Sequence, residues 1–319
     1  MILVKKIKTV LISGSIAYDE IMDFPGEFAD FFHPEKLHQI NVSFVVNKLE
    51  KQLGGTATNI AYNLSRALNF LNNNTFIKIV STLGKDGNVF LRFFKKNKID
   101  VNNITKYNNL FTATGKVITD KKDNQIWGFY YGANEKVFDI DFKNIDKDRS
   151  LSILSATHKD PFLKTQSKFI LNKLSYLYDP GMTLTWIANK DLLQGVMNAK
   201  YLIGNDYEIE MILKRIKKTV NQLTSYGLKV ITTLGEEGVR FNGKNNIVNV
   251  KGFKIKKVVD PTGAGDAWRG GFVAGLISNL ELLDCLKLGN VLASFSIESY
   301  GTVNHNPKKS EIGKRLKSL

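Results

Sequence analysis

Short apolar segments alternate along most of the chain with longer segments of helical spacing, and this alternation restricts the fold more than any other feature of the sequence. After "LGGTATN", for example, the apolar residues Ile60, Leu64 and Leu71 recur on one face of a helix. Strands that alternate with helices are typical of βαβ units, whose mostly parallel sheet is covered on both sides. We therefore predict an α/β protein. The expected strands are "TVLIS" (9–13), "FIKIVSTLG" (76–84), "LSILSA" (151–156), "LSYLYDP" (174–180), "KYLIGN" (200–205) and "KVITTLG" (229–235).

Two stretches break this alternation. Residues 17–49 contain no long helical pattern. The segment "FTATGKVITDKKDNQIWGFYY" (111–131) has two alternating strands around a polar Lys-Lys-Asp-Asn turn, which predicts a β-hairpin. We expect insertions at about 17–49 and 111–133 to form a small sheet beside the main domain. No linker or internal repeat divides the chain, so 1–319 is expected to form a single domain.

Several classes of protein are excluded by composition. The single cysteine, Cys285, excludes a disulfide framework and a cysteine-rich zinc site, and the four histidines show no metal-binding spacing. The N-terminal apolar run is broken by lysines and by Ser13-Gly14, so it is too short for a signal peptide. No run approaches 18 apolar residues, so we expect no membrane span and a cytoplasmic protein.

The chain carries a net charge of +15, which raises the question of a nucleic-acid partner. The lysines are scattered in pairs along the chain, and no module that combines basic and aromatic residues for nucleic-acid recognition is present. We therefore expect no nucleic-acid partner. Solvated faces and the attraction of anionic small molecules account for the charge more simply.

The glycine-rich segment "VVDPTGAGDAWRGGF" (258–272) has the pattern of a strand end, a turn and a helix start. The backbone N–H groups of Gly263, Ala264 and Gly265, with the positive end of the helix, can face an anion. Phosphoryl transfer needs alignment, neutralised charge and a base for the attacking hydroxyl, and Asp266 can be that base. An alternative is that Asp266 simply caps the helix. The three small residues before it favour an open backbone pocket.

Three further segments are ambiguous when each is taken alone. "LGGTATN" either brings backbone and Asn59 to a ligand or joins a loop to a helix capped by a threonine. "GNDYEIEMIL" places Asn205 and Glu208 on one face of a first helical turn, either to orient the waters of a magnesium ion or only to satisfy the helix dipole. "TTLGEEGVRF" either wraps phosphates or is a hairpin. The motifs of P-loop enzymes, protein kinases and dinucleotide-binding domains are absent.

In this order and spacing, "GGTATN", "NDYE" and "DPTGAGDAWRGGF" resemble the signatures of the PfkB/ribokinase family of small-molecule kinases. The resemblance implies a three-layer α/β/α domain with a mostly parallel central sheet and a small β-sheet lid, which transfers the γ-phosphate of ATP to a sugar hydroxyl. The opening "GSIAYDEIMDFPGEFADFFHPEKLHQINVSFVV" is similar to that of the bacterial adenosine kinases in this family. For those enzymes the acceptor is the ribose 5′-hydroxyl, in purine salvage. Another nucleoside, a free sugar such as ribose or fructose, or a catalytically silent ligand-binding relative remain alternatives.

The resemblance assigns roles on the acceptor side and at the reacting centre. It implies that Asp266 is the general base and that the turn before it is the anion hole for the transferring phosphoryl group. The anion-hole residues are Gly263, Ala264 and Gly265. The residues that match those holding the ribose hydroxyls are Asp19, Gly55 and Asn59, with Ser15 nearby.

On the donor side, the resemblance implies ATP and Mg²⁺ as cofactors and K⁺ as a further ion near the anion hole. Asn205 and Glu208 match the motif that influences Mg²⁺ and phosphate, Glu208 indirectly. The nucleotide-binding turn is matched by Thr233, Gly235 and Gly238. The expected neighbours of the potassium ion are Asp260, Thr262 and the "ESYGT" loop.

A purine base needs an aromatic or apolar stacking surface, which we expect from the lid. Phe129 is the first candidate and Trp127 the second, and at strand spacing these two share one face while Tyr130 lies on the other. The alternative is that they pack within the lid or in a dimer interface, since lids of this family often pair in a homodimer. Trp268 stands where the family signature usually has phenylalanine, from which we expect a change in packing without loss of activity.

Overall fold

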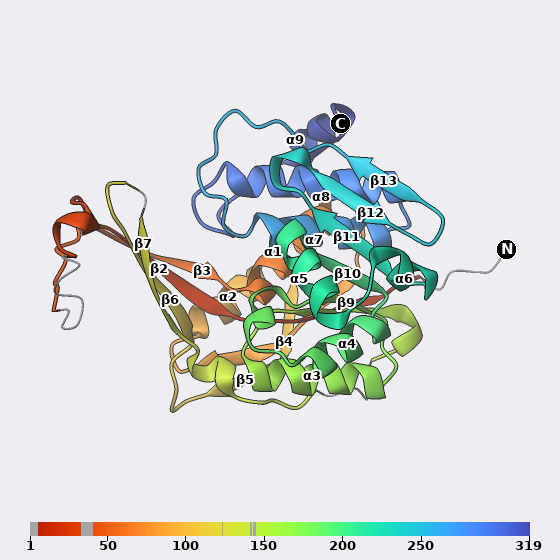
Figure 1. Ribbon diagram of the computed structural model, residues 1–319, viewed down its shortest axis with the longest axis horizontal. Coiled ribbons are helices and arrows are strands. Elements are labelled where there is room, and N and C mark those ends of the chain that lie inside the picture. Colours follow the sequence, from red (N-terminus) through yellow and green to blue (C-terminus); the bar gives the residue numbers. More distant parts are fainter. Residues whose placement is uncertain (1–5, 33–40, 123, 141, 143–144) are drawn as a thin grey trace.

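The structure, a computed structural model, describes residues 6–32, 41–122, 124–140, 142 and 145–319. Asp123 of the predicted hairpin turn, and residues 33–40 of the segment similar to adenosine kinases, lie outside the described residues. Figure 1 shows a main body with one large sheet and a second, smaller sheet that projects from it.

The large sheet has nine strands in the order β13-β12-β11-β10-β9-β8-β1-β4-β5. Its strands are β1 (Thr9–Ser13), β4 (Phe76–Gly84), β5 (Ile99–Tyr107), β8 (Ser150–Ser155), β9 (Tyr176–Asp179), β10 (Tyr201–Asn205), β11 (Lys229–Thr233), β12 (Val239–Asn242) and β13 (Ile247–Val250). Neighbours from β11 to β5 are parallel, whereas β11–β12 and β12–β13 are antiparallel. All six strands expected from the sequence are therefore confirmed, and so is the mostly parallel sheet.

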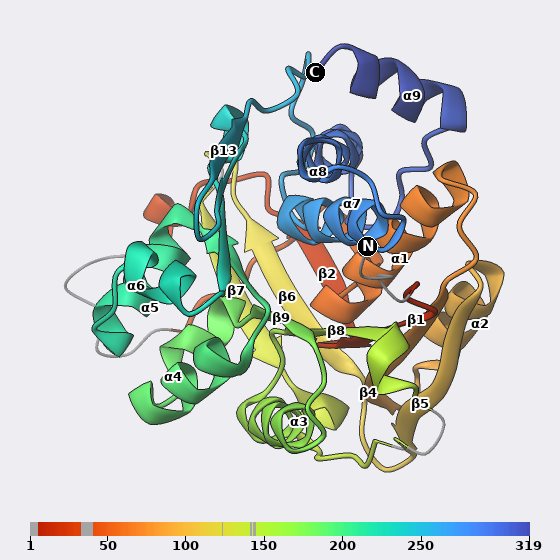
Figure 2. The same ribbon diagram turned by 90° about the vertical axis from the view of Figure 1, so that its right-hand side faces the viewer.

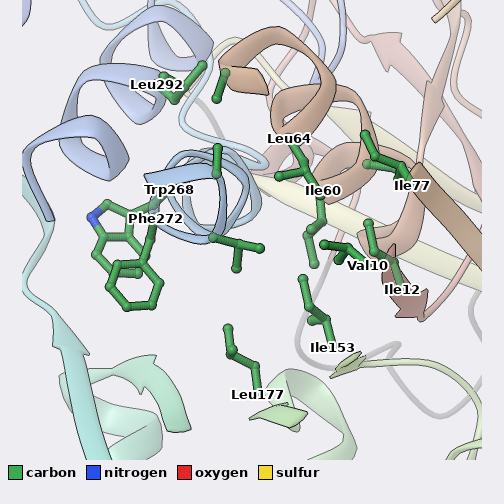
Figure 3. Packing of buried hydrophobic residues seen from close by; sticks show 14 of the residues in the cluster. Val10, Ile12, Ile60, Leu64, Ile77, Ile153, Leu177, Trp268, Phe272 and Leu292 are labelled. Atoms are coloured by element: carbon green, nitrogen blue, oxygen red, sulfur yellow. The ribbon is translucent and has the colours of Figure 1, made fainter. Parts of the chain in front are cut away.

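Helices cover both faces of this sheet because successive strand residues point to opposite sides. In β1, Val10 and Ile12 pack with one group of helices (Figure 3), and Leu11 packs with the other. The first group is α1 (Thr56–Phe70), α2 (Asn88–Lys96), α7 (Ala264–Ile277), α8 (Leu282–Ile297) and α9 (Lys309–Lys317). The second is α3 (Lys159–Leu171), α4 (Asn189–Asn198), α5 (Asp206–Ile216) and α6 (Val220–Ser225). Figure 2 shows the two groups on either side of the sheet, which confirms the three-layer α/β/α fold.

The smaller sheet has four strands in the order β3-β2-β6-β7. They are β2 (Ala17–Asp23), β3 (Lys48–Gly54), β6 (Ala113–Thr119) and β7 (Gln125–Tyr130). β6 and β7 pair antiparallel, as the hairpin pattern predicted. β3 lies mostly beyond the predicted insertion 17–49, because the alternating "KLEKQLG" pairs with β2 through Gly54. We call these four strands the lid sheet.

Short 3-10 helices connect several of these elements. They cover Phe28–Asp30, Gly132–Glu135, Lys147–Arg149, Gly181–Thr185 and Gly235–Glu237. In the part of the chain that the structure describes, no helix is both long and apolar enough to span a bilayer.

The order of the strands fixes where a ligand site can form. From β1 the chain adds β4 and β5 on one side, and then returns to place β8 on the other. In open parallel sheets, ligands bind at the carboxyl ends of the strands near such a reversal of order. The turn after β1 is joined there to the end of β8, since the N–H of Ser15 donates to the carbonyl oxygen of Ala156 at 3.0 Å. β9, β10 and β11 end at the same edge.

Candidate active site

The glycine-rich segment forms the start of α7. The helix begins at Ala264, and its N-cap is Gly263, whose φ of 75° lies in the left-handed region. A Cβ at Gly263 would also lie 2.8 Å from Cγ2 of Thr302, so glycine is required there. Asp266 is the third residue of the helix and makes no capping hydrogen bond. The alternative reading of Asp266 as the N-cap is therefore wrong, because the turn before it is closed by a glycine backbone.

Asp266 is held by a side chain from α1. Nδ2 of Asn59 donates to Oδ2 of Asp266 at 2.9 Å, and Oδ1 of Asn59 accepts from the hydroxyl of Thr302 at 2.7 Å. These two bonds fix which end of the amide faces the carboxylate. Asn59 is only 4% exposed, so the structure joins it to Asp266 rather than leaving both of its polar atoms free for a ligand.

The surroundings of Asp266 bring its pKa into the range that suits a general base. The pKa of Asp266 is raised to about 7, chiefly by burial and in part by the carboxylates Asp179 and Glu208, while Arg269 and the bond from Asn59 act against the rise. A base is most effective when its pKa lies near the working pH. The N–H groups at the start of α7 face the same space, where the helix dipole favours negative charge.

Asp19 is the candidate acceptor carboxylate. Its side chain lies against two glycines: a Cβ built at Gly54 would lie 2.0 Å from Oδ2 of Asp19, and one at Gly115 would lie 3.5 Å from Oδ1. Among the described residues, no hydrogen bond or ion pair is made by this carboxylate. Burial, and then the charge of Asp260, raise the pKa of Asp19 to about 6. A half-buried acid without protein partners is suited to accept hydrogen bonds from ligand hydroxyls.

An aromatic wall stands beside Asp19 on the same face of the lid sheet. A Cβ at Gly115 would lie 3.4 Å from both Phe129 and Trp127, so the predicted shared face of these two residues is confirmed. Phe129 contacts Tyr131 edge to face, with ring centroids 4.8 Å apart, and Tyr131 contacts His158 at 4.9 Å in the same way.

Tyr131 and His158 were not predicted from the sequence as residues of this site. Tyr131 follows Phe129 by two residues, and His158 lies three residues beyond the end of β8 at the reversal of strand order. This position after β8 could have indicated His158 as a site residue, but only once the order of the strands in the sheet is known.

Ser15 and Gly55 connect the turn after β1 to α1. Oγ of Ser15 accepts from the N–H of Thr56 at 3.0 Å. Gly55 has a φ of 89°, and a Cβ there would lie 2.6 Å from the carbonyl oxygen of Ser15. Oγ of Ser15 also lies 3.4 Å from the hydroxyl oxygen of Thr56, so the contacts of Ser15 and Gly55 in this structure are with the protein itself.

Asn205 and Glu208 form a reciprocal capping box at the start of α5. Oδ1 of Asn205 accepts from the N–H of Glu208 at 2.7 Å, and Oε2 of Glu208 accepts from the N–H of Asn205 at 2.8 Å. Burial raises the pKa of Glu208, as does the charge of Asp179, while Arg269 lowers it. The motif therefore caps a helix and also places a carboxylate in the same charged cluster as Asp266.

A cavity of about 410 Å³ lies on the other side of the glycine turn. Its lining includes the three residues predicted for the nucleotide, Thr233, Gly235 and Gly238, together with Ala264 and Gly265. Phe253, Ile255, Trp268 and Ile297 give it apolar walls. We call this space the donor cavity. A cavity of about 450 Å³ beside Ser65 and Asn97 shares no lining residue with it and has no carboxylate in its lining.

Asp260 joins two loops near the glycine turn. Its Oδ1 accepts from the N–H of Thr262 at 2.9 Å, and its Oδ2 accepts from the N–H of Gly301 at 3.0 Å. Both oxygens are thus engaged with backbone. Among the described residues, no group of three or more histidine, cysteine or acidic side chains is arranged to hold a metal ion.

A mostly parallel sheet has a candidate site at the carboxyl ends of its strands, with a buried carboxylate near a helix start beside a cavity. This arrangement fits a small-molecule kinase as the class of protein. The chain matches the model of the pfkB family of carbohydrate kinases over residues 17–309 and belongs to this family. It is accordingly a phosphotransferase with an alcohol group as acceptor.

Individual relatives cover between three quarters and nearly all of the chain. A nucleoside kinase of Methanothermobacter thermautotrophicus is 27% identical over 314 residues, which are 97% of this chain and 96% of the relative. A ribokinase of Lactococcus lactis is 29% identical over 249 residues, 76% of this chain and 80% of the relative. The nucleoside kinase of Burkholderia thailandensis in complex with inosine has a similar structure, with a TM-score of 0.80, 26% identity and 97% of each chain covered. The fold is thus ribokinase-like, as the sequence resemblance implied.

Proposed function

We propose that the protein is a nucleoside kinase that transfers the γ-phosphate of ATP to the 5′-hydroxyl of adenosine, yielding AMP and ADP. One observation carries this proposal: Asp266 directly follows Ala264 and Gly265 of the donor-cavity lining, and its partner Asn59 is linked through Thr302 to the carbonyl oxygen of Leu53, next to Gly54 and the Asp19 carboxylate. Such a position suits a base that takes a proton from an acceptor hydroxyl while the phosphoryl group arrives from the opposite side.

In this mechanism, Asp266 accepts the proton of the 5′-hydroxyl as that oxygen attacks phosphorus. The bond from Asn59 keeps the carboxylate oriented toward the reacting centre. The N–H groups of Ala264 and Gly265 at the positive end of α7 stabilise negative charge on the transferring group. Closure of the lid sheet would exclude water from the reaction.

Mg²⁺ fits the residues on the donor side better than K⁺ does. Glu208 uses one oxygen, Oε2, for the N–H of Asn205 and keeps the other for the waters of a magnesium ion. When bound with ATP, Mg²⁺ would neutralise phosphate charge. For K⁺, both oxygens of Asp260 already accept backbone N–H groups and Thr262 is exposed, so we assign no step to that ion.

The aromatic wall favours a nucleoside over a free sugar. Phe129, Tyr131 and His158 make a run of edge-to-face contacts next to Asp19, and a flat base can stack on such a surface. A free sugar has no group to use it. Two comparisons support the same choice: the Burkholderia relative was solved in complex with inosine and with ADP-inosine, and the Methanothermobacter relative is a nucleoside kinase. The Lactococcus ribokinase keeps a free sugar as the alternative acceptor.

The role of Asp266 is tested by Asp266→Asn, which keeps the side-chain size and removes the base. We expect kcat to fall by about 10²–10⁴-fold, the usual contribution of a general base, with little change in the Kd of adenosine or ATP. Near wild-type turnover by the variant would refute the assignment.

The acceptor is tested by measuring ADP formation with adenosine, inosine, guanosine, cytidine, ribose and fructose. We expect kcat/KM to be highest for adenosine, and higher for each nucleoside than for either sugar. A preference for ribose would replace the proposed acceptor by a free sugar. ADP formation with none of them, together with shifts in melting temperature on adding adenosine, would support a silent ligand-binding protein.

We further propose a homodimer through the outer face of the lid sheet, opposite Phe129. Leu49, Met22, Ile118 and Ile126 are paired across all four strands and form one apolar row there. Leu49 is 65% exposed and Ile126 39%, so the row is open to a partner. Light scattering after size exclusion would give twice the mass of the chain, and Ile126→Lys should return it to a monomer.

A further inference from the structure

A buried ion pair lies directly behind the candidate base. Arg269, one turn after Asp266 in α7, donates through Nη2 to Oδ1 of Asp179 at the end of β9. Oδ2 of Asp179 accepts from the hydroxyl of Ser155 at 2.7 Å. Arg269 is 7% exposed and Asp179 3%. None of these three residues has a role in the proposed reaction so far.

The guanidinium is pressed against the anion hole. A Cβ built at Gly265 would lie 2.6 Å from Nη1 of Arg269, although Gly265 has an ordinary helical backbone. A side chain at the second glycine of "GAGD" would therefore have to displace the end of the arginine, which is held by its ion pair with Asp179. The positive charge of Arg269 therefore lies next to the start of α7, whose N–H groups form the proposed anion hole.

Three carboxylates share this one positive charge. The groups that face Asp266 are Asn59 from α1, Arg269 from α7, Asp179 from β9 and Glu208 from α5. The two carboxylates among them disfavour the ionised form of Asp266, and Arg269 favours it. Without Arg269, three acidic groups would lie together in a largely buried place with no cation to balance them.

Stability is a poor explanation for this pair. Buried ion pairs are often no more stable than apolar residues of the same volume, because both charges lose their hydration. In addition, Nε of Arg269 is buried without a partner among the described residues. A pair that adds little to stability, and leaves a donor unsatisfied beside the anion hole, points to a role in the reaction.

We propose that Arg269, anchored by Asp179 and Ser155, is a positioning residue that keeps Asp266 ionised and ready to accept the proton of the acceptor hydroxyl. This inference rests on the proposed role of Asp266 as the base. Arg269 acts through Asp266 and through the anion hole, and does not itself contact the acceptor.

Arg269 and Asp179 have opposite electrostatic effects on Asp266, so loss of one and loss of the other should shift the pKa of Asp266 in opposite directions. Loss of Arg269 removes the main favourable charge, so the pKa of Asp266 rises. Loss of the charge on Asp179 removes a repulsion and frees Arg269 to interact more with Asp266, so the pKa of Asp266 falls. Two residues with a purely structural role would instead affect the enzyme in the same direction.

The test is the pH dependence of kcat at saturating ATP and adenosine for Arg269→Met, Asp179→Asn, the double variant and Arg269→Lys. For Arg269→Met we expect the acid limb to move upward by about 1 pH unit, hence about tenfold lower activity on that limb. For Asp179→Asn the limb should move downward. The double variant should lie between the two, and Arg269→Lys should stay close to the wild type.

Lys78→Met is the control, because it removes a half-buried ion pair with Asp100 between β4 and β5, outside the groups that face Asp266. Its acid limb should stay in place. Equal shifts in Arg269→Met and Asp179→Asn, or reduced kcat with an unmoved limb, would overturn the proposal. If Arg269→Met does not fold, an unmoved or raised limb in Asp179→Asn overturns it alone. Failure of the base assignment itself is seen separately, as an active Asp266→Asn enzyme.

Discussion

Trp268→Phe should destabilise the protein, although phenylalanine is the residue that the family signature usually carries at this position. Trp268 is 3% exposed and stacks on Phe272, with ring centroids 5.1 Å apart and an angle of 14° between the planes (Figure 3). Its Nε1 donates to Oδ1 of Asn290 at 2.8 Å, and Asn290 in turn donates to the carbonyl oxygen of Lys251 at 2.8 Å. The indole thus joins α7 to α8 and to the wall of the donor cavity.

Two losses make up the expected change in the free energy of unfolding. Phenylalanine cannot donate to Asn290, whose Oδ1 would be left buried and unpaired at a cost of about 1–3 kcal/mol. It also lacks about three heavy atoms of the indole, which removes roughly 1–2 kcal/mol of apolar burial. We therefore expect about 2–5 kcal/mol of destabilisation, with activity retained at temperatures where the variant stays folded.

Gly289→Ala tests the packing around Trp268, when it is combined with Trp268→Phe in a double-mutant cycle. A Cβ at Gly289 would lie 2.7 Å from Nε1 and Cε2 of Trp268, so alanine overpacks the wild-type protein by about 1–3 kcal/mol. With phenylalanine at 268 those atoms are absent, and most of that penalty should vanish. The gain in helix propensity from glycine to alanine is the same in both backgrounds and cancels in the cycle.

The assay is guanidinium denaturation of the wild type, the two single variants and the double variant, with m-values compared to check for two-state unfolding. The reasoning would be refuted if Trp268→Phe lay within about 0.5 kcal/mol of the wild type. It would fail equally if Gly289→Ala were as harmful beside phenylalanine as beside tryptophan.

Three other predictions concern the acceptor, the pH and the donor. Phe129→Ala should raise KM for the nucleoside by about 5–150-fold through lost stacking of about 1–3 kcal/mol, while Ile126→Ala on the opposite face of β7 should leave it unchanged. Burial lowers the pKa of His305 from 6.5 to about 4, so the unfolded chain alone binds a proton between these values. The free energy of unfolding should therefore fall by up to about 3 kcal/mol as the pH is lowered through this window, and His305→Gln should remove that slope in denaturation curves. Arg315→Ala should raise KM for ATP more than KM for the acceptor in initial-rate assays, because its guanidinium lies 4.7 Å from the ring centre of Phe253, a wall of the donor cavity.

The strands could be predicted because the information that sets them is local. Each expected strand is a short apolar run between turn residues, and burial on both faces of a parallel sheet requires such runs. β3 was missed because only its alternation distinguishes it, and its partner β2 lies in a stretch that the sequence did not divide into separate strands. The glycine turn at 263–265 was found for the same local reason.

Contacts between distant parts of the chain could not be predicted in this way. Arg269 and Asp179 are 90 residues apart, and nothing near either residue indicates the other. Asn59 and Asp266 are 207 residues apart. Asn59 and Asp266 were each predicted from the sequence as site residues. Their contact with each other, however, depends on the packing of α1 against α7. His158 depends in the same way on the order of β1 and β8.

The segment "GAGDAWRGGF" shows why a short motif can be informative and still incomplete. Gly263 is needed for its left-handed backbone, whereas a side chain at Gly265 would have to displace the guanidinium of Arg269. The reason for the second glycine is therefore four residues away in the helix, and the reason for the arginine is Asp179 at the end of another strand. If this is the origin of Gly265, then Gly265→Ala should displace the guanidinium and move the acid limb of the pH profile upward, as Arg269→Met does. An unmoved limb in a folded Gly265→Ala enzyme would separate the glycine from the arginine.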